Sequence, residues 1–254
     1  MILSEQIREI VWHEIGHLCL DIILVKKIKS KKLKITELQI HHLNVIDGPK
    51  WGGHVEVLPG PSYIEVVKDI NYFGLKLLTL YSGCLFQNLY HKKILKNDYE
   101  IKNCFCLREG CIGRKDWSDY NSLVSEFTAY CDKKNSIRGN KEIFQFFESY
   151  PKSLKFYNFF IKCINKIVLE LSDKIELDYI NKEKPAKYCY PIKEQELLKL
   201  RKKLHWLVCI FIYPQVIIQC YKFKKSYPNI IKAQSIKLGF FQLNLKTKST
   251  WNPH

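Results

Sequence analysis

Three residues near the start of the chain, His13, Glu14 and His17, have the types and spacing of a metal-dependent hydrolytic centre, H-E-x-x-H. Residues four apart on a helix lie one turn above each other on the same face, so the two imidazoles can bind one ion. The Glu beside the first His can act as a base on a water bound to that ion. The motif predicts one Zn²⁺ bound by His13 and His17, with Glu14 as the catalytic residue.

The residues around this motif favour a buried metal helix. From Ile10 to Cys19, only the His and Glu of the motif can carry a charge. The run from Leu3 to Lys27 contains no Pro and a single Gly, and Ser4 is placed to act as its N-cap. The alternative is a buried helix whose His side chains are simply hydrogen-bonded. Burying two His and a Glu without a metal costs free energy, so we favour the metal site.

Catalytic zinc usually has three protein ligands, so a third must come from elsewhere in the chain. The compact spacing H-E-x-x-H-x-x-G-x-x-H is absent, because positions 20 and 23 are Leu and Ile. A downstream Glu or Asp on a second helix is the remaining source. His41, His42 and His54 lie on or near predicted strands and are weaker candidates.

Length and composition allow one large domain or two small ones. The chain has 254 residues, of which 46% are hydrophobic, and 41 Lys and Arg against 25 Asp and Glu give a formal charge of +16. Such a charge can indicate a nucleic-acid or anionic membrane partner. Scattered Lys among Ile and Asn equally fits a compositional bias, and no nucleic-acid module is recognised. We therefore expect no nucleic-acid partner.

The ten cysteines are predicted to be free thiols. No signal peptide is apparent, because the first residues already belong to the proposed metal helix, so we expect a cytoplasmic protein with reduced cysteines. Cys104, Cys106 and Cys111 could suggest a second metal site, but their spacing matches no standard zinc knuckle.

Hydrophobic patterning and turn residues predict a small hairpin within a mainly helical chain. We expect strands at 35–45 and 53–58, and helices at 4–27, 62–90 (with a break near 72–74) and 116–133. Two helices split at Pro151 are expected within 142–171, an irregular loop at 93–114, a linker-like break at 182–191, and a long apolar-then-basic segment at 194–222.

The segment 204–221 is strongly apolar and has Lys on both sides. A membrane span needs about twenty mostly apolar residues, whereas this segment contains His205, Pro214 and two Gln. We favour a buried, kinked helix over membrane contact.

The order of these elements resembles the peptidase domain of the FtsH-type ATP-dependent zinc metalloproteases. H-E-I-G-H at 13–17 matches the metal helix of that family, and 35–59, ending in G-G-H-V-E-V-L-P, is similar to its strand segment. L-Y-S-G-C-L-F-Q-N-L at 80–89 and W-S-D-Y-N-S-L at 117–123 occupy the places of its Gly-Arg helix and its Asn-Asp-Leu helix start. The resemblance covers roughly residues 1 to 130.

The resemblance implies that Asp119 is the third zinc ligand, with Asp116, three residues earlier, as the rival. The alternative for Asp119 is a plain N-cap carboxylate. The Arg and two Glu of the family signature are replaced here by Cys84, Gln87 and Asn88, and the sequence contains no G-x-x-x-x-G-K-[ST] phosphate-binding loop.

We therefore predict an α+β fold that is mainly α-helical, with a zincin-like metal helix, a small β-sheet or hairpin and a helical C-terminal extension. Residues 1–130 are expected to form an FtsH-peptidase-like domain and 131–254 a basic helical region. The predicted function is zinc-dependent hydrolysis of peptide bonds in unfolded or flexible polypeptides by a Glu-activated, zinc-bound water, without an ATPase of its own. A catalytically inactive metal- or partner-binding relative, and a basic adaptor for nucleic acid or membrane, are the alternatives.

Overall fold

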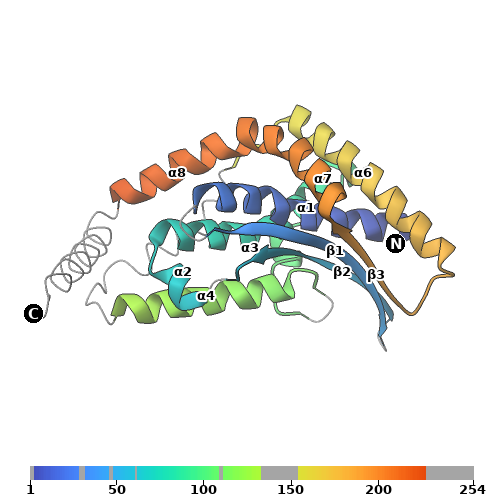
Figure 1. The fold of residues 1–254 in the computed structure, drawn as a ribbon, viewed down its shortest axis with the longest axis horizontal. Helices are drawn as coiled ribbons and strands as arrows, with labels where there is room; N and C mark the ends of the chain where they lie inside the picture. Colours follow the sequence, from blue (N-terminus) through green and yellow to red (C-terminus); the bar gives the residue numbers. More distant parts are fainter. Residues whose placement is uncertain are drawn as a thin grey trace, which may run out of the picture.

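The computed structural model describes residues 3–28, 32–45, 48–60, 62–108, 111–132 and 154–226 (Figure 1). The chain order is α1 (Leu3–Lys27), β1 (Lys34–Val45), β2 (Gly48–Leu58), α2 (Tyr63–Val67), α3 (Ile70–Leu89), the π-helix η2 (Tyr90–Leu95), the short 3-10 helix η3 (Ile101–Asn103), α4 (Arg114–Asp132), α6 (Asn158–Asn181), β3 (Lys187–Lys193), α7 (Glu194–Leu207), the π-helix η5 (Val208–Ile212) and α8 (Tyr213–Ser226). The predicted α+β class, mainly helical with a small sheet, is confirmed.

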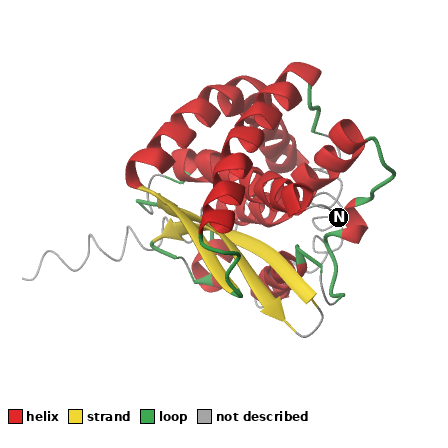
Figure 2. Ribbon diagram, turned by 90° about the vertical axis from the view of Figure 1, so that its right-hand side faces the viewer, coloured by secondary structure: helices red, strands yellow, loops and turns green. Residues whose placement is uncertain are grey.

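Helix α1 is the central element of the molecule. It is apolar on nearly every side, and its side chains are buried almost without a break from Ile7 to Leu24. A helix that is hydrophobic all round has to be covered on all sides. Helix α3 packs along one side, α6 and α7 lie on another, and β1 and β2 cover a third (Figures 1 and 2). The predicted metal helix therefore forms the core, although Ser4 lies inside its first turn instead of capping it.

Glycine lets α1 and α3 approach each other closely. A Cβ on Gly16 would come within 2.9 Å of Cβ of Phe86 and into contact with the carbonyl oxygen of Ser82. Helix α3 is itself buried along its length and is capped by Asp69, whose carboxylate accepts from the backbone N–H groups of residues 71 and 72 at 2.9 and 3.3 Å. The predicted break near 72–74 is wrong: the interruption lies before Ile70, and the packed helix runs through Gly74.

The sheet has three antiparallel strands in the order β2-β1-β3. The predicted hairpin is present: β1 and β2 pair from Lys34 with Leu58 to Val45 with Gly48. Strand β3 pairs with the other side of β1, for example Ile40 with Tyr190. The expectation of a linker-like break at 182–191 is therefore wrong. Tyr188 and Ile192 of this strand are buried, which gives it an apolar face to pack.

The C-terminal half of the chain builds onto the N-terminal half. Strand β3 completes the sheet, and α6 packs against α1. The sheet and the core thus cross the predicted boundary at residue 130, and the division into two domains stays a prediction. Of the two helices predicted within 142–171, the stretch 133–153 lies outside the described residues, and α6 continues to Asn181.

The apolar segment 204–221 is helical but only half buried. Leu204, Val208 and Val216 face the core, whereas Trp206, Ile210 and Ile218 are exposed. The segment passes from α7 through the π-helix η5 into α8, so the regular α-helical hydrogen bonding is interrupted just before Pro214. None of the helices in the described part of the chain is long and apolar enough to cross a membrane.

Candidate metal centre

Helix α1 carries a row of buried polar side chains at intervals of four residues. Glu9, His13, His17 and Asp21 are all buried, and Glu14 lies beside the row. Side chains four apart fall on one helix face, and this face points towards α3 and the start of α4. The spacing of the sequence motif thus translates directly into a buried polar surface inside an apolar core.

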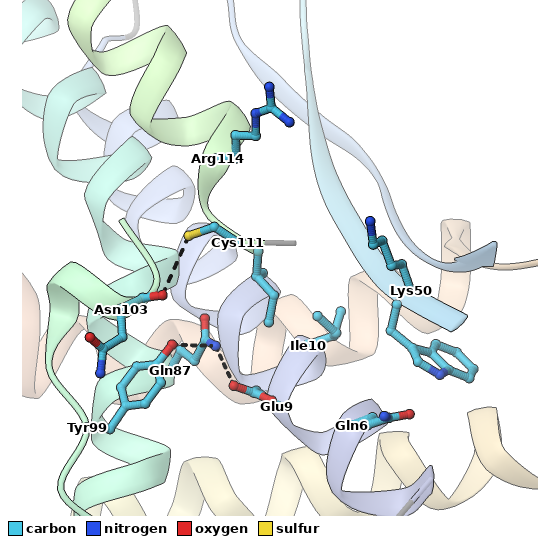
Figure 3. A pocket seen from close by; sticks show the side chains of 11 residues that line it. Gln6, Glu9, Ile10, Lys50, Gln87, Tyr99, Asn103, Cys111 and Arg114 are labelled. Carbon is cyan, nitrogen blue, oxygen red and sulfur yellow. Dashed lines mark hydrogen bonds between the residues drawn. The ribbon is translucent and has the colours of Figure 1, made fainter. Parts of the chain in front are cut away.

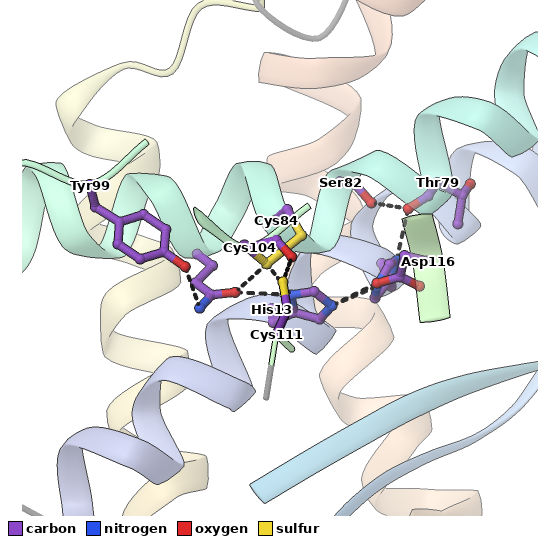
Figure 4. A network of polar contacts seen from close by, with 10 residues as sticks. His13, Thr79, Ser82, Cys84, Tyr99, Cys104, Cys111 and Asp116 are labelled. Carbon is purple, nitrogen blue, oxygen red and sulfur yellow. Dashed lines mark hydrogen bonds and ion pairs between the residues drawn. A yellow bond between two sulfur atoms is a disulfide. The ribbon is translucent and has the colours of Figure 1, made fainter. Parts of the chain in front are cut away.

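Three potential ligand atoms meet at the centre of this surface. Nε2 of His13 and Nε2 of His17 lie 3.0 Å apart, and Oδ2 of Asp116 lies 3.0 Å from the first and 3.2 Å from the second (Figure 4). Asp116 comes from the first turn of α4, more than ninety residues away in sequence. The two His and this Asp form a group that could hold one metal ion.

The structure brings together the rival acid, Asp116, and not Asp119. Asp119 lies one turn further along α4, where its Oδ1 accepts a hydrogen bond at 3.2 Å from the hydroxyl of Tyr63 in α2. Among the described residues, the group of potential ligands around His13 and His17 includes Asp116 and not Asp119. We therefore assign the third position to Asp116 in place of the predicted Asp119.

Both imidazoles are oriented by hydrogen bonds from their other ring nitrogen. Nδ1 of His17 lies 2.8 Å from the carbonyl oxygen of Thr79, which can only accept, so this nitrogen carries the proton. Nδ1 of His13 lies 3.3 Å from Oε1 of Gln87. With hydrogen on both Nδ1 atoms, both Nε2 atoms present lone pairs to the shared centre, as ligating His residues do.

A second buried network holds Gln87 in place. Its amide nitrogen donates to Oε1 of Glu9 at 2.5 Å and to the hydroxyl of Tyr99 at 3.0 Å, which leaves Oε1 to accept from His13. Glu9 in turn pairs with Nε2 of His91 at 2.7 Å. His91 stacks on Tyr99, with ring centroids 3.9 Å apart. A chain of contacts therefore runs from α1 through α3 and back to the imidazole of His13.

Gly83 provides the space for this centre. A Cβ at this position of α3 would touch Nε2 of both His17 and His13, at 2.5 Å from the latter. The space between the two imidazoles and α3 is therefore open because residue 83 has no side chain. Zinc–nitrogen and zinc–carboxylate bonds of about 2.0–2.2 Å in a tetrahedral site place ligand atoms roughly 3.3 Å apart, close to the separations observed here. The three converging atoms, Nε2 of His13, Nε2 of His17 and Oδ2 of Asp116, and the open space beside them fit a zinc ion.

The electrostatics of the centre favour a bound cation. Burial lowers the pKa of His17, but the nearby carboxylate of Asp116, with Glu14 and Asp21 adding to it, outweighs this effect and raises the pKa to about 10. Burial would raise the pKa of Asp116, but the two imidazoles hold it well below its usual range. Without metal, the positive charge at this point is supplied by a proton.

Glu14 is buried beside this group and has an unused oxygen. Its Oε2 has no hydrogen-bond partner among the residues that the structure describes. Burial raises its pKa, while His17 and His13 act in the opposite direction. Gly53 of β2 lies directly against it, since a Cβ on Gly53 would come within 2.7 Å of Cγ of Glu14. A buried carboxylate with a free oxygen is suited to accept a proton from a small molecule at the site.

Two of the cysteines form a disulfide next to the centre, contrary to the predicted free thiols. Cys84 of α3 is bonded to Cys104, whose sulfur lies 3.7 Å from Nδ1 of His13 (Figure 4). Gly113, just before α4, packs on this bond, because a Cβ there would contact Sγ of Cys84 and come within 2.9 Å of the carbonyl oxygen of Cys104. The disulfide thus connects α3 to the loop that delivers Asp116.

The other candidate histidines lie on the sheet, away from this centre. His42 is buried against Trp51 and Tyr179, with ring centroids 4.9 and 5.2 Å away. The ring of His41 lies against Gly52, within 2.8 Å of where a Cβ would stand, and partial burial, with the nearby His54 adding to it, lowers the pKa of His41. None of these three belongs to the groups of potential ligands in the described part of the chain.

Sequence reasoning did not find the residues that support the ligands. Gln87, His91 and Thr79 carry no motif of their own, and Thr79 contributes only its backbone. Glu9 could have been found, because it lies four residues before His13 on an otherwise apolar helix. Comparison of the chain with protein-family models, with curated proteins and with solved structures finds no match.

Proposed function

We propose that this chain forms a zinc-dependent endopeptidase, similar in its catalytic centre to the peptidase domain of the FtsH-type enzymes. The observation that carries the proposal is the meeting of His13, His17 and Asp116 beside the unpartnered carboxylate of Glu14. A metal-binding module needs the first three residues only. A buried Glu with no partner is costly unless it is used in catalysis.

His13, His17 and Asp116 would hold the zinc ion through Nε2, Nε2 and Oδ2. When bound, zinc supplies a Lewis acid that polarises a carbonyl group and makes a water molecule far more acidic. Thr79 and Gln87 fix the orientation of the two imidazoles, and Gly83 keeps the space between them open.

Glu14 supplies the proton transfers. Its carboxylate accepts the proton of the attacking water as the new bond to the peptide carbonyl carbon forms, and then gives that proton to the leaving amine nitrogen. Its raised pKa, caused by burial, makes it a better base than an exposed Glu.

Strand β2 offers a way to bind an extended polypeptide. Within the described part of the chain it is an edge strand, and Gly53 on this strand lies directly against Glu14. A peptide that adds to this edge would run past the base with its backbone held by hydrogen bonds. The closest approach is at a glycine, where no side chain of β2 keeps the peptide away.

A cavity of about 530 Å³ lies beside this edge (Figure 3). It is bounded by α1, by the start of β2 and by the loop that leads into α4, and Gln87 lies at its floor next to His13. Trp51 lines the cavity, two residues from Gly53 and on the same face of the strand. We propose that this cavity takes a side chain of the substrate next to the cleaved bond.

The substrate class that fits this strand edge is an unfolded or flexible polypeptide. A strand edge accepts chain segments that are free to become extended, which folded proteins rarely offer.

The test compares Glu14→Gln with the wild type on an unfolded protein substrate. Glu14→Gln is expected to keep stoichiometric zinc and to lose hydrolysis by a factor of at least about 100, the usual contribution of a general base. Glu126→Gln, an exposed Glu of α4, is the matched control and should keep both properties. Equal rates for Glu14→Gln and wild type would contradict the proposal, and a wild type with full zinc but no activity would favour the non-catalytic alternative.

A further inference from the structure

The outer face of α7 and η5 exposes large apolar side chains. Trp206 is 44% exposed, Ile210 57% and Leu198 48%. Phe159 of α6, also exposed, lies against Trp206 with ring centroids 6.3 Å apart. Positions 198, 202, 206 and 210 are successive steps of four, so they form a single ridge along the helix. This face, defined by Phe159, Leu198, Trp206 and Ile210, is called the outer ridge below.

The chain around the outer ridge is strongly basic. Residues 197–226 contain no Asp or Glu but seven Lys and Arg, at positions 199, 201, 202, 203, 222, 224 and 225. The facing part of α6, residues 154–169, also lacks acid and carries Lys155, Lys162 and Lys166. Lys203 is neutralised by Glu170 at 2.9 Å, whereas Lys202, on the ridge itself, has no acidic partner in the described part of the chain. The fold therefore brings the Lys residues of α6 beside the basic stretch of α7.

An apolar groove with a cationic rim borders the same ridge. A cavity of about 450 Å³ lies between the end of α1 and α7, with Ile22, Val25 and Leu198 among its walls. Four nitrogen-bearing side chains complete it: Lys26, Arg201, Lys202 and His205. Apolar walls beside the cationic side chains of Lys26, Arg201 and Lys202 are complementary to a molecule with an anionic head and an apolar chain.

The outer ridge and the metal centre face opposite ways. Helix α1 lies between them: α6 and α7 pack on one side of it, and α3, with α4 beyond, packs on the other (Figure 1). A flat partner on the ridge would therefore leave the strand β2 and the cavity beside it open.

We propose that the outer ridge binds the surface of an anionic lipid bilayer. Exposed Trp and Ile on a Lys-rich helix are the features of helices that lie in the membrane interface, with the apolar side chains inserted and the cations at the phosphate level. Nucleic acid would also attract the Lys residues, but it offers nothing for Ile210 and Leu198 to contact. This peripheral contact departs from the sequence expectation, which favoured a buried, kinked helix over membrane contact, because Trp206 and Ile210 are exposed.

Sedimentation with vesicles tests this proposal. The full chain is expected to bind phosphatidylcholine vesicles that contain about 30% phosphatidylserine, to bind pure phosphatidylcholine weakly, and to lose binding as salt rises. The double variant Trp206→Ala/Ile210→Ala should weaken binding by about tenfold or more, because two apolar anchors are lost. Lys202→Glu should weaken it by about tenfold.

Matched controls come from the other side of the molecule. Ile64→Ala removes an apolar side chain that is 56% exposed, and Lys68→Glu changes the charge equally; neither should alter binding. Unchanged zinc content shows that the variants are folded. Equal loss in ridge and control variants, or no preference for anionic vesicles, would overturn the proposal. Tighter binding to duplex DNA or RNA, or a dimer that only the Trp206→Ala/Ile210→Ala variant dissociates, would overturn it as well.

Discussion

At the scale of single residues, the carboxylate beside His13 and His17 belongs to Asp116, whereas the resemblance implied Asp119. It lies in the first turn of α4, where the positive end of the helix favours a carboxylate, and it contacts both imidazoles. Asp119 is engaged with Tyr63 instead. Asp116→Ala is expected to reduce zinc affinity by at least about tenfold and to abolish hydrolysis, because two His alone leave the ion short of a ligand. Asp119→Ala should keep both, and zinc loss in Asp119→Ala alone would contradict the assignment.

The proton that His17 carries without metal predicts a pH dependence. Its pKa of about 10 lies above neutral pH, so His17 is protonated in the zinc-free protein, and zinc must displace that proton. Zinc binding should therefore release about one proton at pH 7 and tighten about tenfold for each pH unit between pH 6 and 8. Titration calorimetry in two buffers with different ionisation enthalpies measures the release. An affinity that does not change over this range would contradict the expectation.

At the scale of elements, sequence and structure agree where the signal is local. The apolar run and the four-residue spacing of α1 are sufficient to predict a buried helix with His13 and His17 on one face, and the turn at 47–49 predicts the hairpin. The third ligand depends instead on where the loop before α4 places that helix. This placement is set by the disulfide between Cys84 and Cys104 and by Gly113 packed on it, which are contacts between distant residues. The sequence does not predict strand β3 either. This strand is short, contains Pro191 and pairs with the distant strand β1.

The packing of α3 against the metal helix gives a prediction for Gly83. Gly83→Ala places a methyl group against Nε2 of both His13 and His17, which lie on a helix fixed on all sides. We expect zinc content to fall by at least about tenfold while the helical circular dichroism stays unchanged, since Ala is a better helix former than Gly. Gly60→Ala is the control, because a Cβ there meets nothing within 4 Å. Normal zinc binding by Gly83→Ala would mean that the ion does not lie between the two imidazoles.

At the scale of the whole molecule, one helix serves both as the core and as the site. Helix α1 would contribute two ligands and the base of the proposed site, and it is also the surface on which α3, α6 and the sheet assemble. Burying the polar row from Glu9 to Asp21 therefore costs free energy of folding. The network through Gln87 and His91 offsets this cost by hydrogen bonds only around Glu9 and His13. The spacing in the sequence predicts where this row lies on α1. It does not predict the residues that contact the row, because those come from α3 and α4.

Removal of zinc should therefore destabilise the entire fold and not only the site. The ion would join α1 to α4, and a ligand at about 1,000 times its dissociation constant adds about 4 kcal/mol to the free energy of unfolding. For a chain of this size that corresponds to a fall in Tm of roughly 10 °C when a chelator is added. His17→Ala, which lacks a ligand, should unfold at the same temperature with and without the chelator. A wild type whose Tm is unchanged after its zinc has been removed would show that the two helices are held together by packing alone, and the metal would then have no part in the stability of the fold.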